Sequence, residues 1–136
     1  MAALPLVYAC SGCSSAAQTA NAAALRLDRR GIAEMSCIAG VGGNVAPLVR
    51  LARGGRTIVA LDGCALACVR ACLAQHGITA DHYVPLQGLG VRKRFHADYD
   101  DAEVERVVQH VAQQLRGAGH GAQPPEPAAV TARGGP

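Results

Sequence analysis

Short apolar runs alternate with helical segments along most of this chain. The clearest run, residues 57–61 (Thr-Ile-Val-Ala-Leu), is rich in β-branched side chains and is bounded by glycines, as strands often are. Residues 6–10 give a second strand pattern, and an Ala-rich helical segment follows it. Strands that alternate with helices predict a parallel sheet with right-handed crossovers. We therefore expect an α/β protein with a small three-layer Rossmann-like or flavodoxin-like fold and a mainly parallel sheet of about four strands.

Turn residues set the boundaries of the remaining expected elements. Ser14 or Ser15 is a suitable cap for the first helix, and Asp100 or Asp101 for the last. Pro85 places the last strand at a sheet edge, because proline cannot donate to a sheet ladder. A Gly-rich loop is expected at residues 40–43. The expected strands are 6–10, 32–36, 57–61 and 82–86, and the expected helices are 16–30, 45–53, 64–76 and 101–115.

The length of 136 residues fits one domain. We assign residues 1–116 to a single α/β metal-binding domain. Residues 117–136 are rich in Gly, Pro and Ala, and this composition predicts a disordered C-terminal tail.

Composition excludes several function classes. The net charge of +3 is mild, and aromatic residues make up only 3% of the chain, so the stacking platforms of single-strand binders are scarce. No run approaches the roughly 18 apolar residues that span a bilayer. We expect no nucleic-acid partner and no membrane partner.

The first residues, Met-Ala-Ala-Leu-Pro, lack the charged and apolar regions of a secretory leader. A cytoplasmic location is therefore expected. Cytoplasmic thiols are kept reduced, so the six cysteines are expected to bind metal, to do redox chemistry or to fill the core.

Five cysteines fall where the predicted strands end. Cys10 ends the first strand, Cys37 ends the second, and Cys64 follows the third. Cys13 lies in the turn after Cys10, and Cys68 is expected one helical turn beyond Cys64. Because the carboxyl ends of parallel strands lie along one edge of a sheet, these five thiols should share one neighbourhood.

Four thiolates suit the tetrahedral coordination of structural zinc. The pattern therefore predicts Zn²⁺ as the bound metal ion and favours a binding protein over an enzyme. An iron–sulfur cluster is an alternative, because cysteine thiolates hold such clusters too. A thiol-based redox enzyme is another, since Cys10-x-x-Cys13 before a helix is typical of redox motifs.

Other polar residues carry weaker signals. Cys72 lies about 12 Å along a helix from Cys64, too far for the same single-ion site, and is expected in the core. Asp62 is interpreted either as a group that orients a ligand or as a turn carboxylate. The basic run 92–94 is expected to be a solvated face or a contact for an anionic partner. The scattered histidines are expected at the surface, with His96 the one that approaches the site.

At these residues the chain resembles the DGC family of zinc-binding proteins. The resemblance rests on Cys10-Ser11-Gly12, Gln18 with Asn21, Met35-x-Cys37-x-Ala39-Gly40, Leu61-Asp62-Gly63-Cys64-x-x-x-Cys68 and Gly90-Val91-Arg92-Lys93. It implies that Cys10, Cys37, Cys64 and Cys68 bind zinc. The extra Cys13 leaves open which four of the five thiols are ligands, and the resemblance supplies neither a reaction nor a protein partner.

Overall fold

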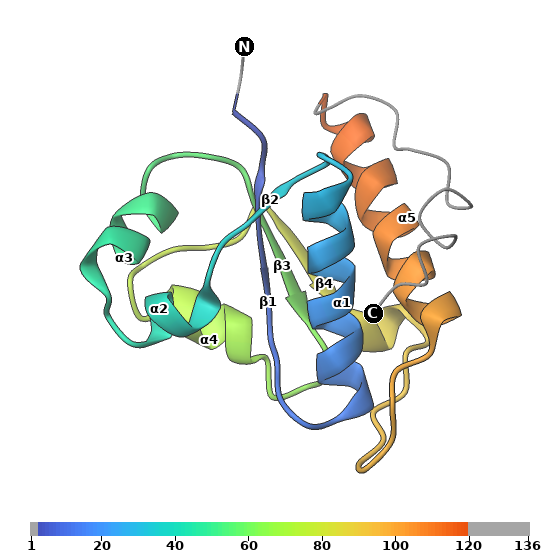
Figure 1. The fold of residues 1–136 in the computed structure, drawn as a ribbon. Coiled ribbons are helices and arrows are strands. Elements are labelled where there is room, and N and C mark those ends of the chain that lie inside the picture. The colour runs from blue at the N-terminus through green and yellow to red at the C-terminus, as the bar shows by residue number, and fades with distance from the viewer. Residues whose placement is uncertain (1–2, 120–136) are drawn as a thin grey trace.

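Four parallel strands form one sheet at the centre of the protein. The computed structural model describes residues 3–119 and orders the strands β2-β1-β3-β4 (Figure 1). The strands are β1 (Leu6–Ala9), β2 (Glu34–Met35), β3 (Ile58–Asp62) and β4 (His82–Pro85). This confirms the predicted α/β fold, and β4 lies at a sheet edge as Pro85 indicated.

Helices cover both faces of the sheet (Figure 1). Five α-helices and one 3-10 helix are present among the described residues. On one face lie α1 (Ser15–Arg29) and α5 (Asp101–Gly117), and on the other lie α2 (Ile38–Gly42), α3 (Ala46–Ala52) and α4 (Cys68–Ala74). The 3-10 helix η1 (Leu86–Leu89) follows β4. None of the described helices is long and apolar enough to cross a membrane.

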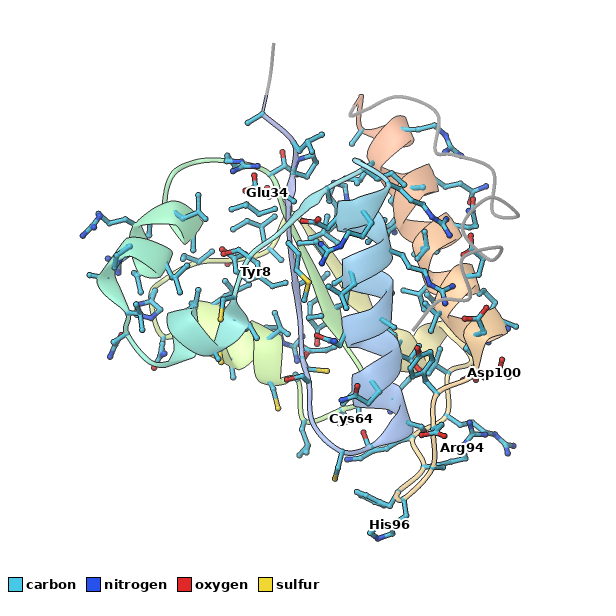
Figure 2. The ribbon with its side chains drawn as sticks, in the orientation of Figure 1. Tyr8, Glu34, Cys64, Arg94, His96 and Asp100 are labelled. Carbon is cyan, nitrogen blue, oxygen red and sulfur yellow. The ribbon has the colours of Figure 1, made fainter. Side chains whose placement is uncertain are left out.

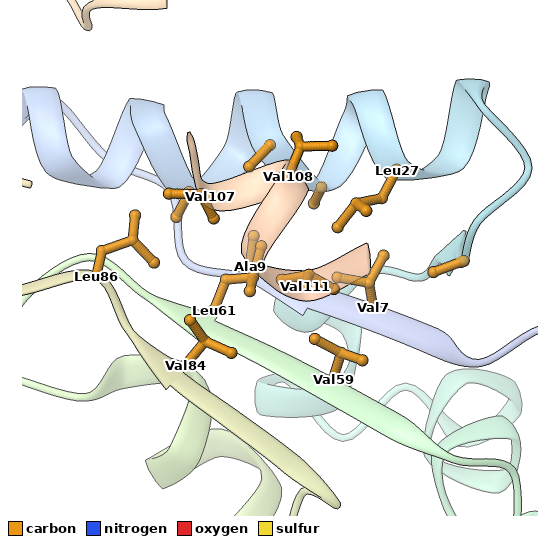
Figure 3. Close-up of a cluster of buried hydrophobic side chains, with 14 of the residues drawn as sticks. Val7, Ala9, Leu27, Val59, Leu61, Val84, Leu86, Val107, Val108 and Val111 are labelled. Carbon is orange, nitrogen blue, oxygen red and sulfur yellow. The ribbon is translucent and has the colours of Figure 1, made fainter. Parts of the chain in front are cut away.

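The central strand β1 is buried on both faces. Val7 and Ala9 pack with α1 and α5, in the core shown in Figure 3, whereas Leu6 and Tyr8 pack on the side of α2 and α4. Side chains alternate between the faces of a strand, so one short apolar run supplies both cores. The predicted caps are also present: Ser14 accepts from the Ala17 N–H, and Asp100 accepts from the Ala102 N–H.

Two expectations for residues 32–43 are wrong. The expected strand 32–36 is only Glu34–Met35, because the N–H groups of Ile32 and Ala33 turn back to the Leu27 carbonyl at the end of α1. The expected glycine loop 40–43 lies largely within α2. Gly40 lets α2 pack closely against α3, since any Cβ at this position would overlap Leu48 of α3.

The prediction for the C-terminal tail lies mostly outside the described residues. Helix α5 extends to Gly117, two residues past the expected end at Leu115.

Charged side chains connect α1 to α5. The guanidinium of Arg30, with 2% of its side chain exposed, makes two hydrogen bonds of 2.8 and 2.7 Å to the carboxylate of Glu105. These bonds lower the pKa of Glu105 to about 2, although burial opposes them. A hydrogen bond from Gln109 and the charge of Arg26 lower that pKa further.

The ion pair predicts how stability depends on pH. An unfolded Glu has a pKa of about 4.3, so ionised Glu105 stabilises the fold fully above that pH, and its contribution is lost as pH falls toward the folded value. The free energy of unfolding should therefore be lower for Glu105→Gln than for the wild type at neutral pH. The difference should shrink below about pH 4 and vanish near pH 2. Urea unfolding followed by circular dichroism at a series of pH values measures this.

The matched control is Asp98→Asn, which neutralises an exposed carboxylate in the loop before α5. It should lower the free energy of unfolding less than Glu105→Gln does. Equal effects of the two substitutions at neutral pH would contradict a stabilising role for the Arg30–Glu105 pair.

Candidate functional site

The carboxyl ends of β1 and β3 lie side by side, and the chain leaves them in opposite directions. Ala9 pairs with Leu61 across the two strands. Helix α1 follows β1 onto one face of the sheet, whereas α4 follows β3 onto the other. Open α/β folds bind their ligands at such a switch point, beyond the carboxyl ends of the strands. The residues that follow the two strands, Cys10 and the Gly63–Cys64 pair, lie there.

Cys10 is half-buried at this switch point. Its Sγ accepts a hydrogen bond of 3.2 Å from the Gly63 N–H. Burial raises the pKa of the Cys10 thiol, the Gly63 N–H opposes this rise, and electrostatic interactions with Asp62, Cys68 and Cys64 raise it further. The hydrogen bond from Gly63 places Cys10 beside the turn that carries Cys64.

Asp62 caps the start of α4 with both carboxylate oxygens. It is 1% exposed, and it accepts from the N–H groups of Val69 (2.8 Å) and Arg70 (3.1 Å). A third bond comes from the hydroxyl of Tyr83 on β4, at 2.9 Å. With these three bonds made, Asp62 acts as the turn carboxylate and not as a free ligand.

Tyr83 is a site residue that sequence reasoning missed. Burial raises its pKa to about 12, and the hydrogen bond to Asp62 and the charge of that carboxylate contribute to the rise. The Arg70 guanidinium lies 4.7 Å from the ring centroid and opposes the rise. The pairing of β3 with β4 brings Tyr83 to Asp62. The sequence alone did not indicate this contact, because a Tyr in a weak strand pattern does not reveal which residue it will meet.

The turn between β3 and α4 corrects the prediction for two cysteines. Cys64 was expected on the same helix as Cys68, but α4 begins at Cys68 itself. Ala67, the residue before it, has a positive φ of 55°. The Asp62 carboxylate binds the first free N–H groups of the helix, which fixes where the helix starts.

The five predicted thiols differ in their surroundings. Cys64 is half-buried and accepts from the Lys93 ammonium at 3.4 Å, and Cys68 is exposed at the first position of α4. Cys37 is exposed at the N-cap of α2, and Cys13 is exposed in the turn before α1. Within residues 3–119, no group of three or more His, Cys, Asp or Glu side chains is placed to hold a metal ion.

Cys72 lies apart from this edge, on the side of α4 that faces α2. It is half-buried, and a Cβ at Gly42 would come within 2.8 Å of its Sγ. The thiol therefore occupies the space that Gly42 leaves open. Burial raises the pKa of Cys72, and electrostatic interactions with Cys68 and Asp62 add to the effect.

The glycine between Asp62 and Cys64 is required by space. A Cβ on Gly63 would lie 2.7 Å from the Ala16 carbonyl oxygen and 3.0 Å from the Ala17 nitrogen, both of which are backbone atoms of α1. The close approach of this turn to α1 also brings the Gly63 N–H to Cys10. An Asp-Gly-Cys sequence therefore supplies, in order, a helix cap, a close contact and a thiol.

A family model for the DGC domain matches residues 6–111. The chain belongs to the DGC family. A DGC relative from Pseudomonas aeruginosa, the "Anaerobic and virulence modulator AnvM", is 53% identical over 116 residues, which cover 85% of this chain and 88% of the relative. No solved structure matches the DGC chain. The expected family resemblance is thus confirmed, and its Asp-Gly-Cys motif is the β3–α4 turn described above.

The contact of Gly63 with α1 predicts the effect of adding one methyl group. Gly63→Ala should lower the free energy of unfolding by about 1–3 kcal/mol, because the α1 backbone must shift. The control is Gly88→Ala in η1, where a Cβ meets nothing within 4 Å, and it should change stability by less than about 0.5 kcal/mol. Chemical unfolding measures both. Similar values for the two variants would show that the turn does not need glycine.

Proposed function

We propose that this DGC protein binds one zinc ion through thiolates at the carboxyl edge of its sheet. The ligands would be Cys10, Cys37, Cys64 and Cys68. The proposal rests chiefly on the switch point between β1 and β3, where the Gly63 N–H donates to the Cys10 Sγ at 3.2 Å and so places Cys10 beside the turn that carries Cys64. Cys37 joins this set because it follows β2, whose neighbour in the sheet is β1.

The donors at this edge fit zinc in their chemistry. Thiolates are preferred zinc ligands, and groups around a metal site commonly hydrogen-bond to those ligands. Two such donors are in place, the Gly63 N–H at Cys10 and the Lys93 ammonium at Cys64. Cys37 and Cys68 are exposed, so their side chains are free to adjust without opening the core.

A zinc ion closed by four thiolates has no open position for a substrate. The site would therefore support metal handling or sensing. The relative's name, an anaerobic and virulence modulator, favours a sensing role for this chain. Thiolates lose their ability to bind metal when they are oxidised, which gives such a site a direct response to oxidants.

The zinc proposal predicts a defined stoichiometry. Protein purified without air should contain about one zinc per chain by elemental analysis. Most of the metal should be lost in each of four variants, Cys10→Ser, Cys37→Ser, Cys64→Ser and Cys68→Ser. The matched control, Cys72→Ala, should keep it, because Cys72 lies between α4 and α2. Protein with no metal and six freely titrating thiols would refute the proposal, and brown protein that contains iron would favour a cluster.

The second candidate function is a thiol-based redox enzyme, and the exposed thiol of Cys13 in the turn before α1 supports it. Cys13 is exposed and lies three residues after Cys10, in the turn that precedes the capping residue Ser14. If four other cysteines hold the metal, Cys13 remains available for thiol–disulfide exchange.

The order of alkylation separates the two functions. In the zinc-loaded protein, Cys13 should be alkylated first, and the four proposed ligands should react only after a chelator removes the metal. Time-resolved labelling with peptide mapping gives the order. Early labelling of Cys10 or Cys37 with protection of Cys13 would show that Cys13 is a ligand. Rapid turnover of a disulfide substrate by Cys13 would favour the enzyme.

A further inference from the structure

A basic loop projects beyond the sheet at the end that carries Cys64. This loop, residues 92–96 (Arg-Lys-Arg-Phe-His), lies between η1 and α5. Figure 2 labels Arg94 and His96 on it, at the same end of the molecule as Cys64. The loop is joined to the thiol site by the hydrogen bond from the Lys93 ammonium to the Cys64 Sγ.

Buried Ser15 at the start of α1 holds the basic loop in place. Ser15 is 1% exposed, and its N–H donates to the Arg94 carbonyl at 2.8 Å. Its hydroxyl donates to the Arg92 carbonyl at 3.2 Å and accepts from the Arg94 N–H at 2.9 Å. A loop fixed by three hydrogen bonds loses little conformational entropy when it binds a partner.

The cations of the basic loop form no ion pairs with the carboxylates of residues 3–119. Arg92, Lys93 and Arg94 are all exposed. By contrast, Arg30 and Arg56 pair with glutamates. Three adjacent cations on a fixed loop create a positive potential that attracts an anionic partner.

Two apolar side chains accompany these cations. Leu66 is 72% exposed and Phe95 is 62% exposed, the highest values among the exposed large hydrophobic side chains of the described chain. The Lys93 ammonium makes contacts near both side chains. It lies 5.1 Å from the Phe95 ring centroid, and it contacts Cys64, which precedes Leu66 by two residues. Leu66 thus lies in the turn that Lys93 contacts through Cys64, and Phe95 lies on the basic loop itself.

We propose that the basic loop, together with Leu66, is a docking surface for an acidic segment of a protein partner, one that carries apolar side chains among its carboxylates. Carboxylates would pair with Arg92 and Arg94, and the apolar side chains would pack on Phe95 and Leu66. Nucleic acid fits less well, because its affinity comes from many phosphate contacts and it offers nothing for Leu66. The surface lies directly beside Cys64, yet the proposal does not depend on zinc.

A labelled peptide tests the docking surface in the full-length protein. The probe is a short fluorescein-labelled peptide of alternating Glu and Leu, and binding is followed by fluorescence anisotropy. The double variant Arg92→Glu/Arg94→Glu should weaken binding by about tenfold or more. The double variant Leu66→Ser/Phe95→Ser should weaken it severalfold, and added salt should weaken binding to the wild type.

Matched controls make the result specific to this surface. Arg50→Glu/Arg116→Glu reverses two exposed charges on α3 and α5 and should leave the affinity within about twofold. A peptide with Ser in place of Leu should bind more weakly than the probe. Unchanged thermal unfolding of each variant would confirm that its fold is intact.

Several results would overturn the proposal. These are no binding of the probe, equal weakening by the remote charge reversals, or equal affinity for the Ser peptide. Tighter binding of a DNA duplex that depends on Arg92 and Arg94 would assign the surface to nucleic acid instead.

Discussion

The pairing of β1 with β3 is the constraint on which the site depends. These strands are neighbours in the sheet although α1, β2, α2 and α3 separate them in the chain. Their pairing continues past the strand ends, where the Cys10 N–H donates to the Leu61 carbonyl. The next contact, from the Gly63 N–H to the Cys10 Sγ, already belongs to the candidate site. The register of β1 and β3 therefore sets the position of Cys10 relative to the turn that carries Cys64.

Asp62 connects this register to the helix that carries Cys68. A buried carboxylate is costly unless its oxygens are hydrogen-bonded, and Asp62 satisfies both through Val69, Arg70 and Tyr83. These bonds fix the start of α4 and hold β4 close to β3. Asp62 is thus a positioning residue for the candidate metal centre, because it fixes the start of the helix that carries Cys68.

Ser15 contributes from the other face of the sheet, at the start of α1. This residue begins α1, the helix that Gly63 touches through Ala16, and it also holds the basic loop. One helix start therefore fixes both the turn that carries Cys64 and the loop that carries Lys93. The proposed docking surface and the proposed zinc site share this support, although they use different chemistry.

The sequence by itself determined the α/β alternation, the helix caps at Ser14 and Asp100, and the placement of Cys10 and Cys64 at strand ends. These features follow from local patterns, because apolar runs and capping residues act within a few positions along the chain. It did not determine that Cys64 lies outside α4 or that Gly40 and Gly42 are helical. The first feature depends on the Asp62 cap on α4, and the second accompanies the close packing of Gly40 against Leu48 of α3. Only the tertiary structure brought Tyr83 to Asp62 and Lys93 to Cys64, since contacts between residues more than twenty positions apart leave no periodic trace in a single sequence.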